Sequence, residues 1–119
     1  MNLLDELRGL GVNVDEGLDR VMGDNSLYEM MLGMFVDAIA ATPISPEEFS
    51  GSDLDELIRK VHTLKGTTGN LSLTPLFDGY METLGLLRNG QPAQARAEFE
   101  RMLPVQAKII ACIEQHRNA

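Results

Sequence analysis

The sequence predicts an all-α protein: an antiparallel four-helix bundle with one or two short N-terminal helices packed against it. Apolar residues recur at intervals of three and four along most of the 119 residues, which is the periodicity of amphipathic helices. Glycine, asparagine and proline separate these periodic runs, where they end helices. No segment shows the sustained alternation, bounded by hairpin turns, that is typical of a strand. Four of the predicted helices are long and closely connected, which favours a bundle.

The first two predicted helices are short. One covers residues 2–8 and ends at Gly9, and the other covers about residues 15–22 and ends at Gly23. We expect them to cover one end or one side of the bundle.

The third predicted helix covers about residues 26–41 and ends before Pro43. Ser26 and Glu29 fit a capping box at its start. A single buried stripe is predicted along it: Leu27, Met31, Met34, Phe35 and Ala38. The cluster of Met30, Met31 and Met34 could also form a soft binding surface, but we favour core filling. In the following loop we expect one turn that begins at Ser45-Pro46.

Three more long helices are predicted, at about residues 52–71, 75–89 and 92–116. The seam of the first is Leu54, Leu57, Val61, Leu64, Thr68 and Leu71. The last contains Pro104, which lacks a backbone N–H and crowds the preceding turn, so we expect a bend or break there.

Composition favours one cytoplasmic domain over residues 1–119. Hydrophobic residues make up 44% of the chain, enough for a core, and no apolar run approaches the roughly 20 residues of a membrane span. The N-terminus lacks the basic region of a signal peptide, and a single cysteine, Cys112, excludes an intrachain disulfide. The net charge of -8 argues against nucleic acid as a partner. The acids are concentrated in residues 1–56, which hold 13 acids and 2 bases.

One stretch of the helix predicted at 52–71 carries more than packing residues. His62 lies well off the apolar seam. Three residues follow it on the same exposed stripe, at i+3, i+4 and i+7: Lys65, Gly66 and Gly69. Arg59 extends the stripe toward the N-terminus. A glycine inside a helix costs roughly 1 kcal/mol relative to alanine, so we expect these two to serve a purpose. They could leave an open surface beside the imidazole, or they could allow close helix packing. We favour the open surface for Gly66, whereas for Gly69 both explanations stay open.

These residue types suit phosphoryl transfer. An imidazole titrates close to neutral pH, so an exposed one is substantially neutral at pH 7 and its ring nitrogen can attack phosphorus. Lys65 would place positive charge beside the phosphoryl oxygens. Such electrostatic stabilisation is the main contribution that a protein makes to phosphoryl transfer. The two histidines show no metal-binding spacing, so no metal site is expected.

The run His62-Thr63-Leu64-Lys65-Gly66 closely resembles the signature of histidine-containing phosphotransfer (HPt) domains. Upstream residues are similar to the N-terminal half of that family: Gly11-Val12-Asn13-Val14, Leu18, Gly23-Asp24, Leu27-Tyr28 and Phe35. The resemblance spans nearly the whole chain and implies a four-helix bundle.

The resemblance also implies roles. His62 would accept a phosphoryl group from a receiver-domain aspartate and pass it to another, Lys65 would stabilise that group, and Gly66 would provide clearance. We expect Gly66, Gly69, Arg59 and Thr63 to form the receiver docking surface. The expected partners are response-regulator receiver domains and a hybrid sensor kinase. The chain itself would be no enzyme and would bind no cofactor, with Mg²⁺ supplied by the receiver.

Two positions depart from the family pattern. Ser72 follows the motif where many members have glycine, and the position expected to face the histidine from the next helix holds Leu84, with Glu82 nearby on another face. Two alternatives remain: a helical binding module for a response regulator or kinase that carries no phosphate, and the phosphoacceptor part of a larger kinase. No ATP-binding sequence follows and the chain starts at Met1, so we expect a free-standing protein.

Overall fold

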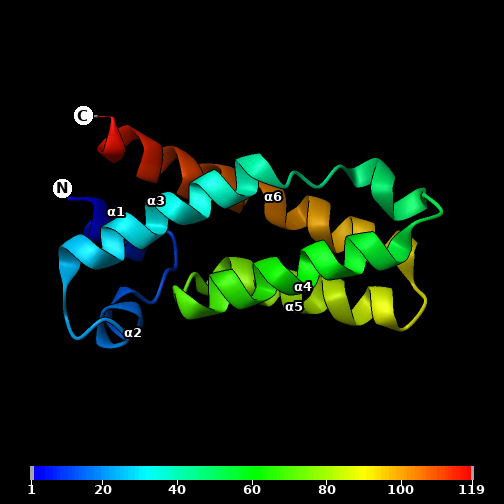
Figure 1. The fold of residues 1–119 in the computed structure, drawn as a ribbon, viewed down its shortest axis with the longest axis horizontal. Helices are drawn as coiled ribbons and strands as arrows, with labels where there is room; N and C mark the ends of the chain where they lie inside the picture. Colours follow the sequence, from blue (N-terminus) through cyan, green and yellow to red (C-terminus); the bar gives the residue numbers. More distant parts are fainter. Residues whose placement is uncertain (1, 119) are drawn as a thin grey trace.

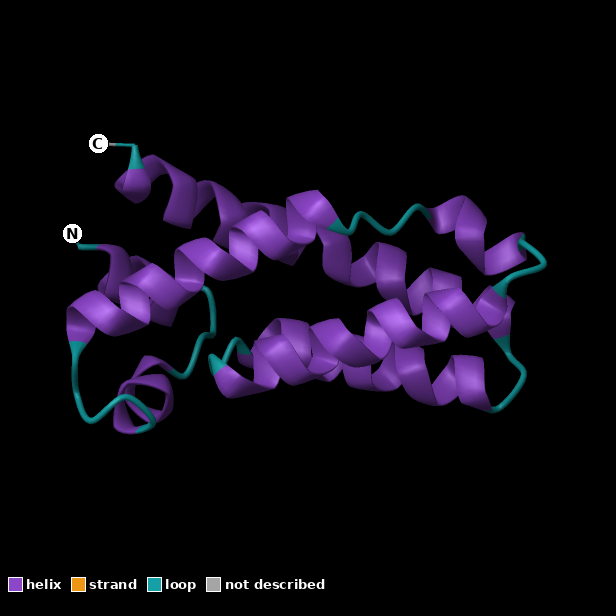
Figure 2. Cartoon of the chain, viewed as in Figure 1, coloured by secondary structure: helices purple, strands orange, loops and turns teal. Residues whose placement is uncertain are grey.

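The computed structural model describes residues 2–118, and every regular element in that range is a helix (Figures 1 and 2). The elements are α1 (Leu3–Gly9), α2 (Val14–Asp19), α3 (Asn25–Ala41), the 3₁₀ helix η1 (Pro46–Ser50), α4 (Leu54–Asn70), α5 (Thr74–Arg88) and α6 (Pro92–Arg117). The predicted all-α class is confirmed. The four long helices begin and end within two residues of the predicted bounds.

The long helices alternate in direction along the molecule, which measures 42 × 25 × 22 Å (Figure 1). The helices α4 and α5 form a tight antiparallel pair, and α6 packs along α5. In contrast, α3 packs mainly against α6 rather than α4. The two short helices, α1 and α2, lie at the end of the molecule that also holds both chain ends (Figure 1).

Side-chain caps set the starts of the helices. Asp24 caps α3 by accepting a hydrogen bond from the backbone N–H of Leu27 at 3.0 Å. The predicted capping box of Ser26 and Glu29 is therefore wrong, because α3 has already begun at Asn25. The turn expected at Ser45-Pro46 is confirmed as η1, in which Ser45 forms a capping box.

The buried face of α3 differs from the predicted one. Tyr28, Leu32, Phe35 and Val36 are buried, whereas Met34 is 60% exposed. Of the predicted stripe, only Phe35 is fully buried; Leu27 and Met31 are partly buried, and Ala38 is exposed. The prediction failed because α3 is apolar on nearly all sides, so its periodicity fits two faces.

Contacts with the end of α6 fix which face turns inward. Arg117 donates to the carbonyl oxygen of Gly33 at 3.1 Å and to both carboxylate oxygens of Asp37 at 3.0 and 3.1 Å. These bonds hold one flank of α3 against α6 and leave the methionine flank turned away from it.

The helix α6 runs unbroken through Pro104, so of the predicted bend or break the break is wrong, whereas the bend stays a prediction. Both Pro104 and Glu100, whose carbonyl loses its helical partner, are exposed. Water can therefore satisfy that carbonyl. On the opposite side of the helix, Met102 and Gln106 are buried and keep both segments packed.

None of the helices in residues 2–118 combines the length and the apolar character that crossing a bilayer requires.

Candidate functional site

His62 projects from the solvent side of α4. The helix begins after Asp53, whose side chain accepts a hydrogen bond from the N–H of Glu56 at 3.1 Å. Its buried side consists of Leu57, Val61, Leu64 and Thr68. The orientation predicted for His62 is confirmed, because this residue is exposed. One turn further on, Lys65 is partly buried and Gly66 is exposed.

The two glycines of the motif have different surroundings. A Cβ atom built on Gly66 would meet no other atom within 4 Å. A Cβ on Gly69 would lie 3.0 Å from Cδ1 and 3.1 Å from Cε1 of Phe77 on α5. Gly66 therefore meets the requirement for an open surface next to His62. Gly69 instead allows the ring of Phe77 to pack against α4.

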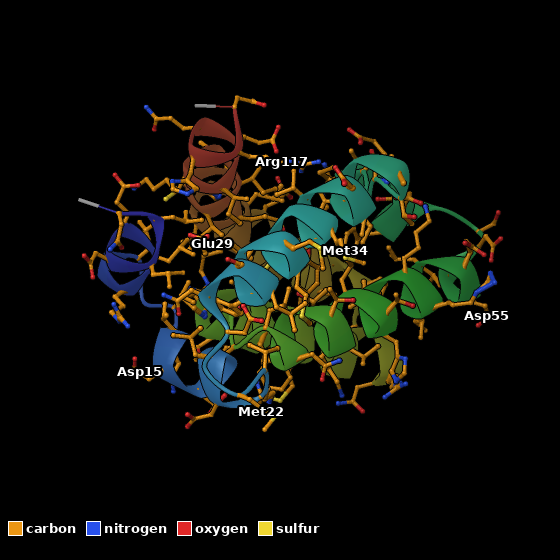
Figure 3. All side chains as sticks on the ribbon, turned by 60° about the vertical axis from the view of Figure 1, so that its left-hand side comes forward. Asp15, Met22, Glu29, Met34, Asp55 and Arg117 are labelled. Carbon is orange, nitrogen blue, oxygen red and sulfur yellow. The ribbon has the colours of Figure 1, made fainter. Side chains whose placement is uncertain are left out.

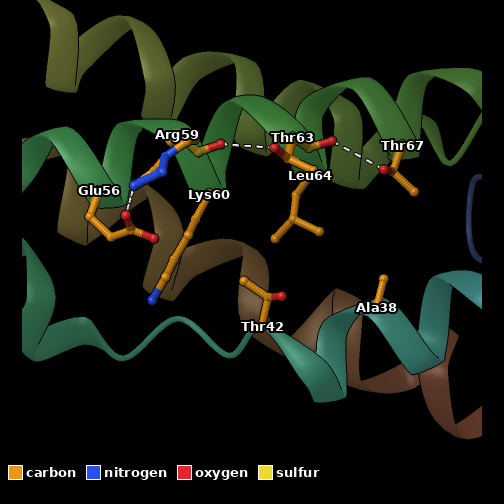
Figure 4. Close-up of a pocket in the computed structure, with 8 residues that line it drawn as sticks. All are labelled: Ala38, Thr42, Glu56, Arg59, Lys60, Thr63, Leu64 and Thr67. Atoms are coloured by element: carbon orange, nitrogen blue, oxygen red, sulfur yellow. Dashed lines mark hydrogen bonds and ion pairs between the residues drawn. The ribbon is translucent and has the colours of Figure 1, made fainter.

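Arg59 and Thr63 lie on the other flank of α4 (Figure 4). Thr63 Oγ1 donates to the carbonyl oxygen of Arg59 at 3.0 Å, and Thr67 Oγ1 donates to that of Thr63 at 3.1 Å. Arg59 also forms an ion pair with Glu56. The predicted docking residues are thus divided between two flanks, with Gly69 toward α5 and Arg59 and Thr63 toward α3.

A groove separates α3 from α4 on this second flank. It consists of two adjoining pockets that share Ala38 and Thr67. One is lined by Ala38, Thr42, Glu56, Arg59, Lys60, Thr63, Leu64 and Thr67, and the other by Met31, Met34, Phe35, Ala38, Thr67, Asn70 and Leu71. We call this the α3–α4 groove. Figure 3 shows Met34 on the side of α3 nearer α4.

The methionine cluster does not fill the core as predicted. Met30 and Met34 are 58% and 60% exposed, and only Met31 is partly buried. Their thioethers give α3 an exposed apolar surface that adapts readily to different shapes.

The N-terminal segment holds the end of α4. Arg20 donates to the carbonyl oxygens of Gly69 at 2.9 Å and Asn70 at 3.2 Å, and to Ser72 Oγ at 2.5 Å. Ser72 Oγ in turn donates to Glu16 at 2.7 Å. This hydrogen bond, together with the charge of Arg20, holds the pKa of Glu16 below its ordinary value. Sequence reasoning missed this clamp, because its partners are about fifty positions apart.

Ser72, just after the end of α4, has an unusual backbone conformation. Its φ is +55°, a left-handed conformation that normally favours glycine. The side chain is buried and hydrogen-bonded to both Arg20 and Glu16. These bonds offset the backbone strain of a serine in this conformation.

Neither Leu84 nor Glu82 on α5 offers a polar contact to the imidazole of His62. Leu84 is buried in the core, with 2% of its surface exposed. Glu82 lines a pocket between α5 and α6 together with Arg101, and so points away from α4.

Within residues 2–118, no three histidine, cysteine, aspartate or glutamate side chains are grouped closely enough to hold a metal ion. No family model matches the chain, and no significant match exists among the curated proteins or the solved structures.

Proposed function

We propose that this chain is a phosphorelay carrier with the antiparallel four-helix bundle of an HPt domain. His62 accepts a phosphoryl group from a receiver-domain aspartate and passes it to another receiver. The observation that carries the proposal is the exposed imidazole with an open glycine and a lysine one turn away: His62, Gly66 and Lys65. The resemblance of this motif to the HPt signature supports it.

For this phosphoryl transfer the carrier supplies a nucleophilic nitrogen and a positive charge. The unprotonated ring nitrogen of His62 supplies the electron pair of the new N–P bond. The P–O bond of the aspartyl phosphate breaks, and the aspartate leaves as a carboxylate. The charge of Lys65 stabilises the phosphoryl oxygens. Mg²⁺ belongs to the receiver, and the phosphoryl group enters the relay from a hybrid sensor kinase, so the carrier needs no catalytic reaction of its own.

The test uses the two histidines of the chain as matched sites. Phosphorylated receiver domains are incubated with the wild type, His62→Gln and His116→Gln, with and without Mg²⁺. We expect acid-labile phosphate on the wild type and His116→Gln but none on His62→Gln, with equal helical circular dichroism in all three. If folded His62→Gln takes up acid-labile phosphate, His62 is not the acceptor.

A second candidate function is a helical binding module that carries no phosphate. The exposed methionines along the α3–α4 groove favour it, because such surfaces suit adaptable protein contacts. Stable binding of a receiver or kinase, with no phosphate on the wild type under any donor, would support this candidate instead.

A further inference from the structure

Six glycines lie inside the helices α2 to α5, and four of them have a side chain of another element close to the position that a Cβ would occupy. A Cβ would press against a neighbour at three of these: Tyr28 at Gly17, Phe77 at Gly69 and Met102 at Gly79. At Gly33 a Cβ would lie 3.5 Å from the side chain of Arg117, which is an ordinary contact. The other two are Gly66 and Gly85, where a Cβ would meet no other atom within 4 Å. Since glycine inside a helix is destabilising, these two are unexplained by the fold.

Gly85 lies at the level of His62 on the neighbouring helix. The antiparallel helices α4 and α5 are joined by a short turn and meet where Gly69 packs against Phe77. His62 precedes Gly69 by seven residues, about 10 Å along the axis, and Leu84 follows Phe77 by the same number. Gly85 is therefore about 1.5 Å beyond the level of His62.

The direction of Gly85 follows from the same contacts. At 100° per residue, Gly85 is rotated about 80° from Phe77, which faces α4, and about 120° from Gly79, which faces α6. Gly85 is exposed, whereas Leu84 beside it is buried. A side chain at position 85 would thus stand on the outer surface of α5, on the side nearer to α4 and His62.

We propose that Gly85 determines steric access to His62 from α5, as Gly66 does from α4. The inference rests on the proposed function and adds a residue to it. The receiver that carries the aspartyl phosphate must contact both α4 and α5. Reactive contact requires about 3–3.5 Å between the ring nitrogen and phosphorus, so a side chain that holds the receiver slightly away would slow transfer strongly. A small phosphodonor would pass beside it.

The experiment compares Gly85→Leu and Gly85→Ala with Gly9→Leu as the matched control. Gly9 is also exposed and open to a Cβ, but it lies on α1, beside a pocket with α6. Three quantities are measured for each variant: the rate of transfer from a phosphorylated receiver, the rate of loading by phosphoramidate, and the melting temperature.

For Gly85→Leu we expect transfer from the receiver to fall by about tenfold or more, with an unchanged rate of loading by phosphoramidate. Its melting temperature should equal or exceed that of the wild type. In Gly85→Ala the rate of transfer from the receiver should fall less, and Gly9→Leu should match the wild type in both rates.

Three results would overturn the inference. The first is transfer by Gly85→Leu at the wild-type rate. The second is an equal loss with receiver and phosphoramidate, which would place the effect on His62 itself. The third is unfolding, which would make Gly85 a packing glycine. Failure of the proposed function is separate, because it appears in the wild type as a lack of phosphate from every donor.

Discussion

At the scale of single residues, Ser72 shows how hydrogen bonds can offset backbone strain. A left-handed conformation costs a residue with a side chain roughly 1–2 kcal/mol. Here the hydroxyl group accepts from Arg20 and donates to Glu16 while almost completely buried. The left-handed turn directs the chain from α4 into α5, and the N-terminal segment supplies the groups that stabilise it.

Replacement of Ser72 by alanine should therefore destabilise the fold by about 1–2 kcal/mol, because the strain remains while both hydrogen bonds are lost. Ser72→Gly should lose less stability than Ser72→Ala, since glycine adopts the left-handed conformation without strain. Urea unfolding of the two variants and the wild type measures the difference. Alanine as stable as wild type would show that the hydroxyl does not offset the strain.

Lys65 is the second residue whose role can be separated from folding. Lys65→Ala should slow transfer to His62 by roughly 10- to 1000-fold, because the lost charge acts on the phosphoryl oxygens as they transfer. Binding of the unphosphorylated receiver should change little. Lys108→Ala, which removes an exposed charge from α6, is the control. An unchanged rate at saturating receiver would exclude the role given to Lys65.

At the scale of elements, α3 shows what periodicity cannot decide. The helix has two apolar faces, and its contacts with α6 bury the one that contains Tyr28 and Leu32. The face with Met30 and Met34 remains exposed. A sequence pattern finds both faces but cannot tell which one the neighbouring helix covers.

The two faces of α3 should respond differently to substitution. Leu32→Ala, which empties a fully buried position, should lower the free energy of unfolding by about 2–5 kcal/mol. Met34→Gln should change it by no more than about 0.5 kcal/mol, because that side chain is already 60% exposed. Chemical unfolding distinguishes the two. Equal losses would mean that the methionine face is covered in solution.

At the scale of the whole molecule, local signals predicted more than distant ones did. The bounds of the long helices follow from prolines, glycines and periodic runs, all of which act within a few residues. The exposure of His62 followed likewise from its place off the seam of α4. For Gly69 the sequence left packing and an open surface undecided, because the choice depends on where α5 places Phe77. The clamp of Arg20 on Ser72 and the open position of Gly85 also depend on tertiary structure.

Both tyrosines of the chain hold distant elements together. Tyr28 donates to the carbonyl oxygen of Leu71 at 2.7 Å and joins α3 to the end of α4. Tyr80 donates to Gln106 at 2.5 Å and joins α5 to α6. Burial raises the pKa of Tyr28 to about 12, and it raises the pKa of Tyr80 as well. Burial, with Glu6 alongside, also raises the pKa of Cys112 to about 11.

The fold should consequently lose stability in alkali. An unfolded tyrosine loses its proton near pH 10, whereas the folded ones keep theirs to higher pH. In that interval the folded state binds more protons, so the contribution of the tyrosines to stability is full below about pH 10 and falls as pH rises, by at most about 1.4 kcal/mol per pH unit for each tyrosine. Cys112 adds to the loss from about pH 9.

Urea unfolding at pH 8 to about pH 11 measures this loss, and tyrosinate absorbance in the near ultraviolet follows the two tyrosines directly, because the chain has no tryptophan. Tyr28→Phe and Tyr80→Phe should each be less stable at pH 8, since each loses a hydrogen bond, but each should decline less steeply with pH. In Cys112→Ser the loss of stability should begin at a higher pH than in the wild type. A decline as steep as that of the wild type in all three variants would place the alkaline sensitivity in other groups.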